Sequence, residues 1–187
     1  RRECQLAVKN RTRAQASETD LWLLFAPVKK ARLDFIAQKA CEMGCSRIWP
    51  VRTDYTQVAR VNDDRMLANV IEAAEQTERL DIPEVMEFLP LEEALEACGS
   101  ERRLIFCDES AAGDVAANPV RVLGGAGSIS SAAVLIGPEG GFSDTERAMI
   151  ERRQNSLKLS LGPRILRADT AAIAALTCFQ SVSGDWA

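Results

Sequence analysis

A turn of Gly-Pro-Glu-Gly-Gly stands where residues 134–146 (VLIGPEGGFSDTE) pass from an apolar run to the start of a helix. Pro138 fixes one backbone angle, and the glycines beside it let a ligand approach bare main chain. Ser143, followed three residues later by Glu146, matches the capping box with which many helices begin. The segment predicts a strand, a turn and a helix. The turn is either a simple tight connection or a ligand site, and the run of glycines favours a ligand.

The carboxylate of Glu139 restricts what this turn could hold. The turn contains no Lys and matches neither of the common glycine-rich phosphate-binding motifs. A carboxylate ~5 Å from a phosphate charge costs about 3 kcal/mol at an effective dielectric constant of about 20. We therefore expect a neutral or cationic ligand, unless Glu139 points away from it.

A second unusual loop covers residues 161–170 (LGPRILRADT). Two apolar residues, Ile165 and Leu166, stand between Arg164 and Arg167, an arrangement that exposed loops rarely need. Backbone and aliphatic groups here could enclose a flat heterocycle while the arginines reach an anion such as an RNA phosphate.

The same loop also has purely structural explanations. Asp169 or Thr170 is expected to be the N-cap of the last helix, which would explain either residue without a function. Salt bridges from the two loop arginines to Asp169 or Glu139 would explain the arginines equally well.

Some chemistries are excluded or disfavoured by composition. The chain has no His, which removes Ser-His-Asp and Cys-His catalysis. Its six Cys form no C-x-x-C pair, so we expect buried free thiols and no metal site. Residues 1–50 carry ten Lys and Arg against five Asp and Glu, whereas residues 51–100 carry four against twelve. The basic N-terminal part could meet a polyanion or could simply be a solvated surface.

The two loops must be positioned by the strands and helices on either side of them. Along the chain, short apolar runs alternate with segments of helical periodicity. Such alternation predicts an α/β fold with a parallel sheet flanked by helices. A small-residue segment at 111–131 is expected to be a loop. In an open parallel sheet ligands sit beyond the carboxyl ends of the strands, where both unusual loops and residues 107–110 (CDES) would lie. The expected strands are 21–26, 46–51, 84–88, 103–107, 133–137 and 157–161, and the expected helices are 32–43, 63–79, 91–98, 143–153 and 170–182.

These stretches resemble a known family. "LIGPEGGFSDTE" and "LGPRILRADTA" are similar to the two signature stretches of the ribosomal small-subunit methyltransferase E family, a member of the SPOUT class of S-adenosylmethionine-dependent RNA methyltransferases. "KKARLDFIAQKACEMGC" and "IEAAEQTERLDIPEV" also resemble helices of that family, so the likeness covers roughly residues 20–182.

The resemblance implies a SPOUT-type domain with a C-terminal trefoil knot, at residues 21–187. Residues 1–20 would be the remnant of an N-terminal PUA-like β-barrel RNA-binding domain. The first residue is Arg rather than Met, and we expect the natural protein to be longer. The implied protein is a cytoplasmic homodimer, without a metal or a membrane association, that methylates N3 of a uridine in small-subunit (16S) ribosomal RNA.

The implied cofactor is S-adenosylmethionine, whose sulfonium cation is compatible with Glu139. The family's usual Arg-Thr-Glu-Thr-Ala appears here with Ala168 and Asp169 at its second and third positions. This change suggests that the length of the acid is not critical or that the acid caps the helix. By matching positions, the cofactor pocket would be formed by Cys107, Asp108, Glu109, Ile136, Gly137, Pro138, Glu139, Gly140, Gly141, Phe142, Leu161, Gly162, Arg164, Ile165 and Leu166.

Uracil N3 is a poor nucleophile while it holds its proton, so the enzyme needs a proton acceptor, a stabiliser of the resulting anion, or both. We expect Arg167 to stabilise the developing charge or an RNA phosphate, with Asp169 or Glu139 as the base. N3 lies on the pairing edge, so the target base must be unpaired or extruded. The residues expected to bind RNA are Lys29, Lys30, Arg32, Arg164 and Arg167.

Two other classes of protein remain possible on the sequence. One is a nucleotide- or phosphate-binding α/β enzyme with a degenerate glycine loop, which the missing Lys and the presence of Glu139 disfavour. The other is a knotted RNA-binding module that has lost catalysis.

Overall fold

Seven short strands pair side by side in a single parallel sheet, in a computed structural model that describes residues 3–15 and 19–187. The strand order is β3-β2-β1-β6-β5-β7, with β4 also paired to β2, and every pairing is parallel. The predicted α/β class is therefore confirmed. The strands are β1 (Asp20–Phe25), β2 (Arg47–Arg52), β3 (Glu84–Val85), β4 (Leu89–Pro90), β5 (Arg103–Cys107), β6 (Ser131–Ile136) and β7 (Ser156–Leu159).

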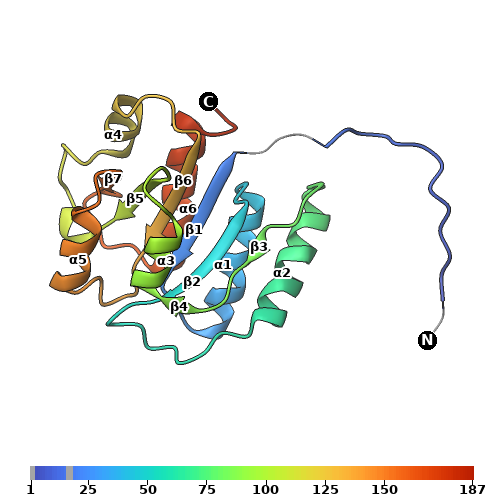
Figure 1. Cartoon of the computed structure of the whole chain (residues 1–187), viewed down its shortest axis with the longest axis horizontal. Helices are drawn as coiled ribbons and strands as arrows, with labels where there is room; N and C mark the ends of the chain where they lie inside the picture. Colours follow the sequence, from blue (N-terminus) through green and yellow to red (C-terminus); the bar gives the residue numbers. More distant parts are fainter. Residues whose placement is uncertain (1–2, 16–18) are drawn as a thin grey trace.

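Helices cover both faces of this sheet. One face is packed against α1 (Lys30–Glu42), α2 (Asp63–Gln76), α4 (Pro119–Gly125) and α6 (Ala168–Ser183). The other face is covered by α3 (Leu91–Ala97) and α5 (Asp144–Glu151). Residues 3–15 contain no helix or strand and extend away from the sheet (Figure 1). In the described ranges no helix is long and apolar enough to cross a membrane.

The central strands are apolar at nearly every position because both of their faces are buried. In β1 the side chain of Leu23 joins the core on the α6 side, and that of Leu24 joins the core on the α5 side. In β6 Val134 joins the core on the α6 side, and Leu135 joins the core on the α5 side. Successive side chains of a strand point to opposite faces, so a doubly covered sheet needs continuous rather than alternating apolar runs.

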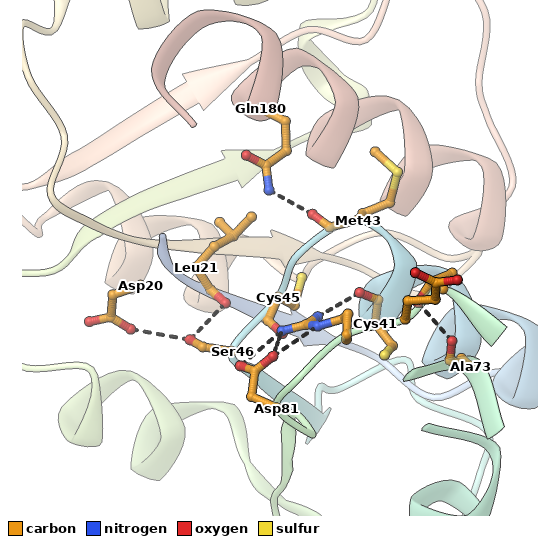
Figure 2. Close-up of polar contacts among 12 residues, drawn as sticks. Asp20, Leu21, Cys41, Met43, Cys45, Ser46, Ala73, Asp81 and Gln180 are labelled. Atoms are coloured by element: carbon orange, nitrogen blue, oxygen red, sulfur yellow. Dashed lines mark hydrogen bonds and ion pairs between the residues drawn. The ribbon is translucent and has the colours of Figure 1, made fainter. Parts of the chain in front are cut away.

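A polar network holds the segments around the end of α1 (Figure 2). The side chain of Arg79 donates to the carbonyl oxygens of Cys41 (2.6 Å) and Cys45 (3.1 Å) and pairs with Asp81. Gln180 of α6 donates to the carbonyl of Met43 at 2.6 Å. The carbonyl of Cys41 also accepts from the N–H of Gly44, so Arg79 adds a second donor there. Together these bonds tie the end of α1 to the segment after α2 and to α6.

The structure corrects some expected boundaries. The segment at 111–131 is not only a loop: Pro119–Gly125 form α4, capped by Asn118, whose side chain accepts from the N–H of Arg121. Helix α2 is capped by Asn62 and ends at Gln76, three residues before the expected end at 79. The strand expected at 84–88 is only two residues long, and β4 follows it.

The chain after β7 lies against the segment that follows β5. The N–H of Gly113 donates to the carbonyl of Gly162 at 3.2 Å, and the N–H of Ser160 donates to the carbonyl of Ala117 at 2.8 Å. These bonds hold the second unusual loop beside the residues between β5 and α4. The trefoil knot implied by the resemblance stays a prediction.

Candidate functional site

The carboxyl ends of three neighbouring strands meet at one cavity. The pairing register places Cys107 at the end of β5 beside Ile136 of β6 and Leu159 of β7. A cavity of about 180 Å³ opens there. It is lined by all of the predicted cofactor residues except Gly140, so parts of the chain more than 50 positions apart converge as expected. The cavity is also lined by Ala112, Leu159, Arg167, Ala168 and Ala171.

The glycine turn is shaped by close packing on both sides. A Cβ atom at Gly137 would lie 2.7 Å from the ring of Phe142, which is buried and packs edge-on against Phe106 with ring centroids 5.1 Å apart. Gly141 has a φ of +71°, and a Cβ there would collide with the carboxylate of Glu109. Only glycine meets both requirements without strain, which explains the residue types of the turn.

The helix after the turn begins as predicted. The N–H of Glu146 donates to the hydroxyl of Ser143 at 3.3 Å, and the N–H of Ser143 donates to the Glu146 carboxylate at 2.9 Å. This reciprocal pair confirms the capping box and fixes the direction in which the glycine turn enters α5.

The second loop presents apolar and cationic groups to the cavity. Ile165 is 76% exposed at the cavity wall, although it is a large apolar residue. In the described ranges Arg164 and Arg167 form no ion pair, so the alternative that each is held by Asp169 or Glu139 was wrong. Both arginines are exposed and remain available to an anionic ligand.

Helix α6 begins earlier than expected. Its N-cap is Arg167, which makes no capping bond with its side chain, and the helix starts at Ala168. The prediction that Asp169 or Thr170 is the cap was therefore wrong. Asp169 lies in the first helical turn and accepts from the N–H of Thr170 at 3.0 Å. An acid in the first turn is stabilised by the helix dipole without being the cap.

A single arginine joins the two proposed bases. Nη1 of Arg32 lies 3.2 Å from Oε1 of Glu139, and Nε of the same side chain lies 3.8 Å from Oδ2 of Asp169. Arg32 belongs to the first turn of α1, so the glycine turn, the second loop and α1 meet at the rim of the cavity. Lys29 precedes α1 and is exposed, and Lys30 begins the helix with a side chain outside the described part.

A buried carboxylate lies in the wall of the cavity. The side chain of Asp108 is fully buried, 3.3 Å from Nε of Arg147 and 3.1 Å from Nζ of Lys158. Burial acts to raise the pKa of Asp108, but hydrogen bonds from Ser110 and the two cations outweigh it and hold the pKa below its ordinary value. Asp108 is thus ionised at neutral pH and holds the end of β5 to α5 and β7.

The sequence analysis missed Arg147 and Lys158. Both look like ordinary solvated cations, one in α5 and one in β7, and no local motif connects them to Asp108. The thiol beside this carboxylate is inert. Burial, with a smaller contribution from Cys178, raises the pKa of Cys107 to about 12. Cys107 therefore stays protonated and contributes to the wall rather than to nucleophilic chemistry.

The expectation for the cysteines holds in part. Cys41, Cys45 and Cys98 are buried free thiols, whereas Cys4 is exposed. No group of three or more His, Cys, Asp or Glu within residues 3–15 and 19–187 could hold a metal ion.

The fold and the cavity define the class of α/β proteins with a cavity for a small molecule at the carboxyl ends of the strands. Comparison with known proteins narrows this class. A family model described as an RNA methyltransferase domain matches residues 15–180. The chain belongs to this RNA methyltransferase domain family.

Individual relatives agree with this family. Ribosomal RNA small subunit methyltransferase E from Rickettsia conorii is 30% identical over 90% of the chain, and the match spans 67% of that protein. The Bacillus subtilis protein of the same name is 29% identical over 80% of the chain, and the match spans 60% of it. The crystal structure of the Neisseria gonorrhoeae enzyme bound to S-adenosyl methionine is 27% identical, with a TM-score of 0.78 over 90% of this chain and 68% of that one.

Proposed function

We propose that this chain is the methyl-transferring domain of an S-adenosylmethionine-dependent enzyme that methylates N3 of a uridine in small-subunit ribosomal RNA. The observation that carries the proposal is the cavity at the ends of β5, β6 and β7, lined by the two family signature stretches. The chain spans only about 60 to 67% of the curated relatives described above, so the activity is proposed for the whole protein.

The groups that line the cavity fit this cofactor chemically. Ile136, Leu159 and Leu161 offer apolar surface to a purine ring. The carboxylate of Glu139, which lines the cavity, suits a ligand with a positively charged sulfur, whereas it would repel phosphate. The exposed side chain of Ile165 is apolar surface that such a ligand would cover.

When bound, S-adenosylmethionine supplies an electrophilic methyl group on a cationic sulfur. The chain's own residues must orient the acceptor base and manage the N3 proton. We assign proton removal to Glu139 or Asp169, which face one another across Arg32 at the rim. Arg167, exposed in the cavity wall, stabilises the negative charge that develops on the uracil ring as the proton leaves.

RNA would reach this rim from the side of α1 and the second loop. Arg164 is exposed there and has no ion-pair partner in the described ranges, and Lys29 is exposed before α1. Both would contact phosphates, with a salt-dependent affinity. Arg32 is paired with two carboxylates, so its first role is to hold Glu139 and Asp169 together, and contact with RNA is a second role. Residues 1–20 stay proposed as the end of a preceding RNA-binding domain, and the cytoplasm stays the proposed location.

A second copy of the chain is the proposed protein partner. A shallow apolar groove of about 550 Å³ lies between the segment 113–120 and α6. Val115 and Val120, at 76% and 65% exposed, lie on its edge, and Ala174 and Cys178 of α6 form part of its wall. Helix α6 is apolar on most of its surface, so the part that faces this groove is better buried than exposed to water. An identical chain would bury it through a symmetric contact.

The test is methyl transfer from labelled S-adenosylmethionine to small-subunit ribosomal RNA that lacks the modification, with the whole protein as the enzyme. We expect label at N3 of one uridine, located by mass spectrometry of nucleosides and of RNA fragments. Calorimetry with S-adenosylmethionine and with ATP separates the alternatives. Binding of ATP alone would indicate a nucleotide-binding enzyme. Binding of RNA without methyl transfer, on free RNA or on assembled subunits, would indicate a module without catalysis.

A further inference from the structure

The loop between β2 and α2 places an aromatic side chain against the glycine turn. Tyr55 is the chain's one tyrosine and is 51% exposed. It lies against the glycine turn, because a Cβ atom at Gly140 would be 3.2 Å from Cβ and 3.5 Å from Cγ of Tyr55. Gly140 is the one predicted cofactor residue that does not line the cavity, and its outer side is occupied by this tyrosine.

The loop that carries Tyr55 is held rigidly. The N–H of Thr53 donates to the hydroxyl of Thr56 at 2.9 Å, and the N–H of Thr56 donates back to the carbonyl of Thr53 at 3.1 Å. Thr53 itself is buried. Tyr55 therefore occupies a central position of a closed turn, so little conformational entropy remains to be lost when a ligand contacts it.

This turn is also fastened to the capping box of α5. The N–H of Asp54 donates to Oε1 of Glu146 at 2.9 Å, and Oδ2 of Asp54 accepts from the hydroxyl of Ser143 at 2.6 Å. The same two residues that direct the glycine turn into α5 thus also position the tyrosine loop. The tyrosine and the glycine turn behave as one unit.

The glycine turn that Tyr55 contacts also carries a carboxylate that lines the cavity. Glu139, adjacent to Gly140, is half-exposed and paired with Arg32. A half-exposed aromatic ring on the outer side of this turn, one residue along the chain from the cavity-lining Glu139, is suited to a flat ligand with polar edges. Unpaired RNA bases are bound in this way, by stacking on aromatic side chains and hydrogen bonding at their edges.

We propose that Tyr55 is the stacking platform for the acceptor base as it enters the cavity. This inference rests on the proposed function, in which the acceptor is an unpaired uracil. A base taken out of an RNA stack loses its stacking partners, and Tyr55 replaces one of them while the N3 edge faces Glu139 and Arg32. Tyr55 is a positioning and specificity residue and takes no part in proton transfer.

The first test compares Tyr55→Leu with Tyr55→Phe in the whole protein. Loss of the ring should lower kcat/KM for ribosomal RNA by roughly 10- to 100-fold, mainly through KM, whereas Phe should retain the wild-type value. The dissociation constant for S-adenosylmethionine, measured by calorimetry, should stay within about twofold for both variants. Trp186→Leu is the matched control, since Trp186 is an exposed aromatic residue beyond the opposite end of α6.

A second test on the unaltered protein does not depend on how the variants fold. Ribosomal RNA carrying 4-thiouridine is irradiated with the protein, and the cross-linked tryptic peptides are identified by mass spectrometry. We expect the peptide of residues 53–60, released by cleavage after Arg52 and Arg60, with the link at Tyr55.

The outcomes separate this inference from the proposed function. If the wild-type protein transfers no methyl group to RNA, the proposed function fails, and the inference fails with it. If the wild type is active, a Tyr55→Leu variant with wild-type kcat/KM overturns the inference alone. Cross-links confined to other peptides would also overturn it alone. Should Tyr55→Leu lose cofactor affinity as well, the cross-link on the wild type decides.

Discussion

Two charged residues at the cavity have partners that explain their placement. Arg32 draws Glu139 and Asp169 together from separate loops, which leaves Arg164 and Arg167 as cavity-lining cations without a carboxylate partner in the described ranges. Asp108 is fully buried and joined to two cations. The first arrangement bears on the proposed reaction and the second on the stability of the site.

Replacement of Arg167 by Ala should reduce methyl transfer by roughly 100-fold or more, because a donor aimed at developing charge acts mainly in the transition state. The affinity for S-adenosylmethionine should change less than about threefold. Single-turnover assays and calorimetry measure the two quantities. Arg103→Ala, at the opposite end of β5, is the control. An equal loss of rate and of cofactor affinity would show that Arg167 binds the cofactor instead.

Replacement of Asp108 by Asn should lower the free energy of unfolding at pH 7 by about 1–3 kcal/mol, since two cations lose a buried partner. The folded-state pKa of Asp108 is depressed, so its stabilisation is present above the ordinary pKa near 4. That stabilisation is lost as the pH falls through the lower folded value.

Urea denaturation at several pH values tests this prediction. The difference between wild type and Asp108→Asn should be largest above about pH 4 and should shrink in more acidic solution. Glu72→Gln, an exposed acid in α2, is the control and should change stability by less than about 0.5 kcal/mol. A difference that is constant from pH 3 to pH 7 would be inconsistent with an ionised, paired Asp108.

At the scale of elements, the unit formed by β6, the glycine turn and α5 organises the site. Phe142 folds back over Gly137 and packs against Phe106 of β5, while the capping box starts α5 and holds the loop of Tyr55. Two strands, a helix and a loop are therefore coupled through one short turn.

Gly137→Ala should destabilise the protein by about 1–3 kcal/mol, because the added methyl group would lie 2.7 Å from the Phe142 ring in a filled core. In a Phe142→Leu background the same change should cost less than about 0.5 kcal/mol, since the clashing ring atoms are gone. Thermal and urea unfolding of the four proteins measure this coupling. Gly124→Ala, with nothing within 4 Å of the new Cβ, is the control. Equal costs of Gly137→Ala in both backgrounds would contradict the proposed clash.

At the scale of the whole molecule, the cavity and the polar network at the end of α1 lie in different parts of the fold. The end of α1 and its neighbours are held by hydrogen bonds that include those from Arg79 (Figure 2), whereas the cavity lies at the carboxyl ends of β5, β6 and β7. The apolar groove beside α6 and the segment 113–120 lies next to that cavity, because Leu161 and Gly162 line both.

Val120→Asp should convert the proposed dimer into a monomer, because a charge would have to be desolvated within an apolar contact. Size-exclusion chromatography with light scattering measures the mass at micromolar concentration. Ile82→Asp, at another exposed apolar position that does not line the groove, should leave the mass unchanged. A wild-type protein that is monomeric under these conditions would refute the proposed assembly.

Much of the fold could be read from the sequence because its signals are local. The apolar runs at 103–107 and 133–137 and the helical pattern at 32–43 predicted elements that the structure confirms within a few residues. Helix α4 was missed in a segment rich in small residues, although Asn118 followed by Pro119 is a regular helix start. The short β3 was overestimated because pairing, not composition, ends a strand.

The sequence by itself determined the residues of the two signature loops, the capping box, and the edge of the sheet at which those loops meet. These features follow from backbone stereochemistry, hydrophobic period and parallel connectivity, which act over a few residues or along one element. Only the tertiary structure decided that Arg32 holds both acids, that Arg147 and Lys158 hold Asp108, and that Tyr55 stands over Gly140. Each of these contacts joins side chains far apart in the chain, and such pairings depend on how whole elements pack rather than on any local pattern.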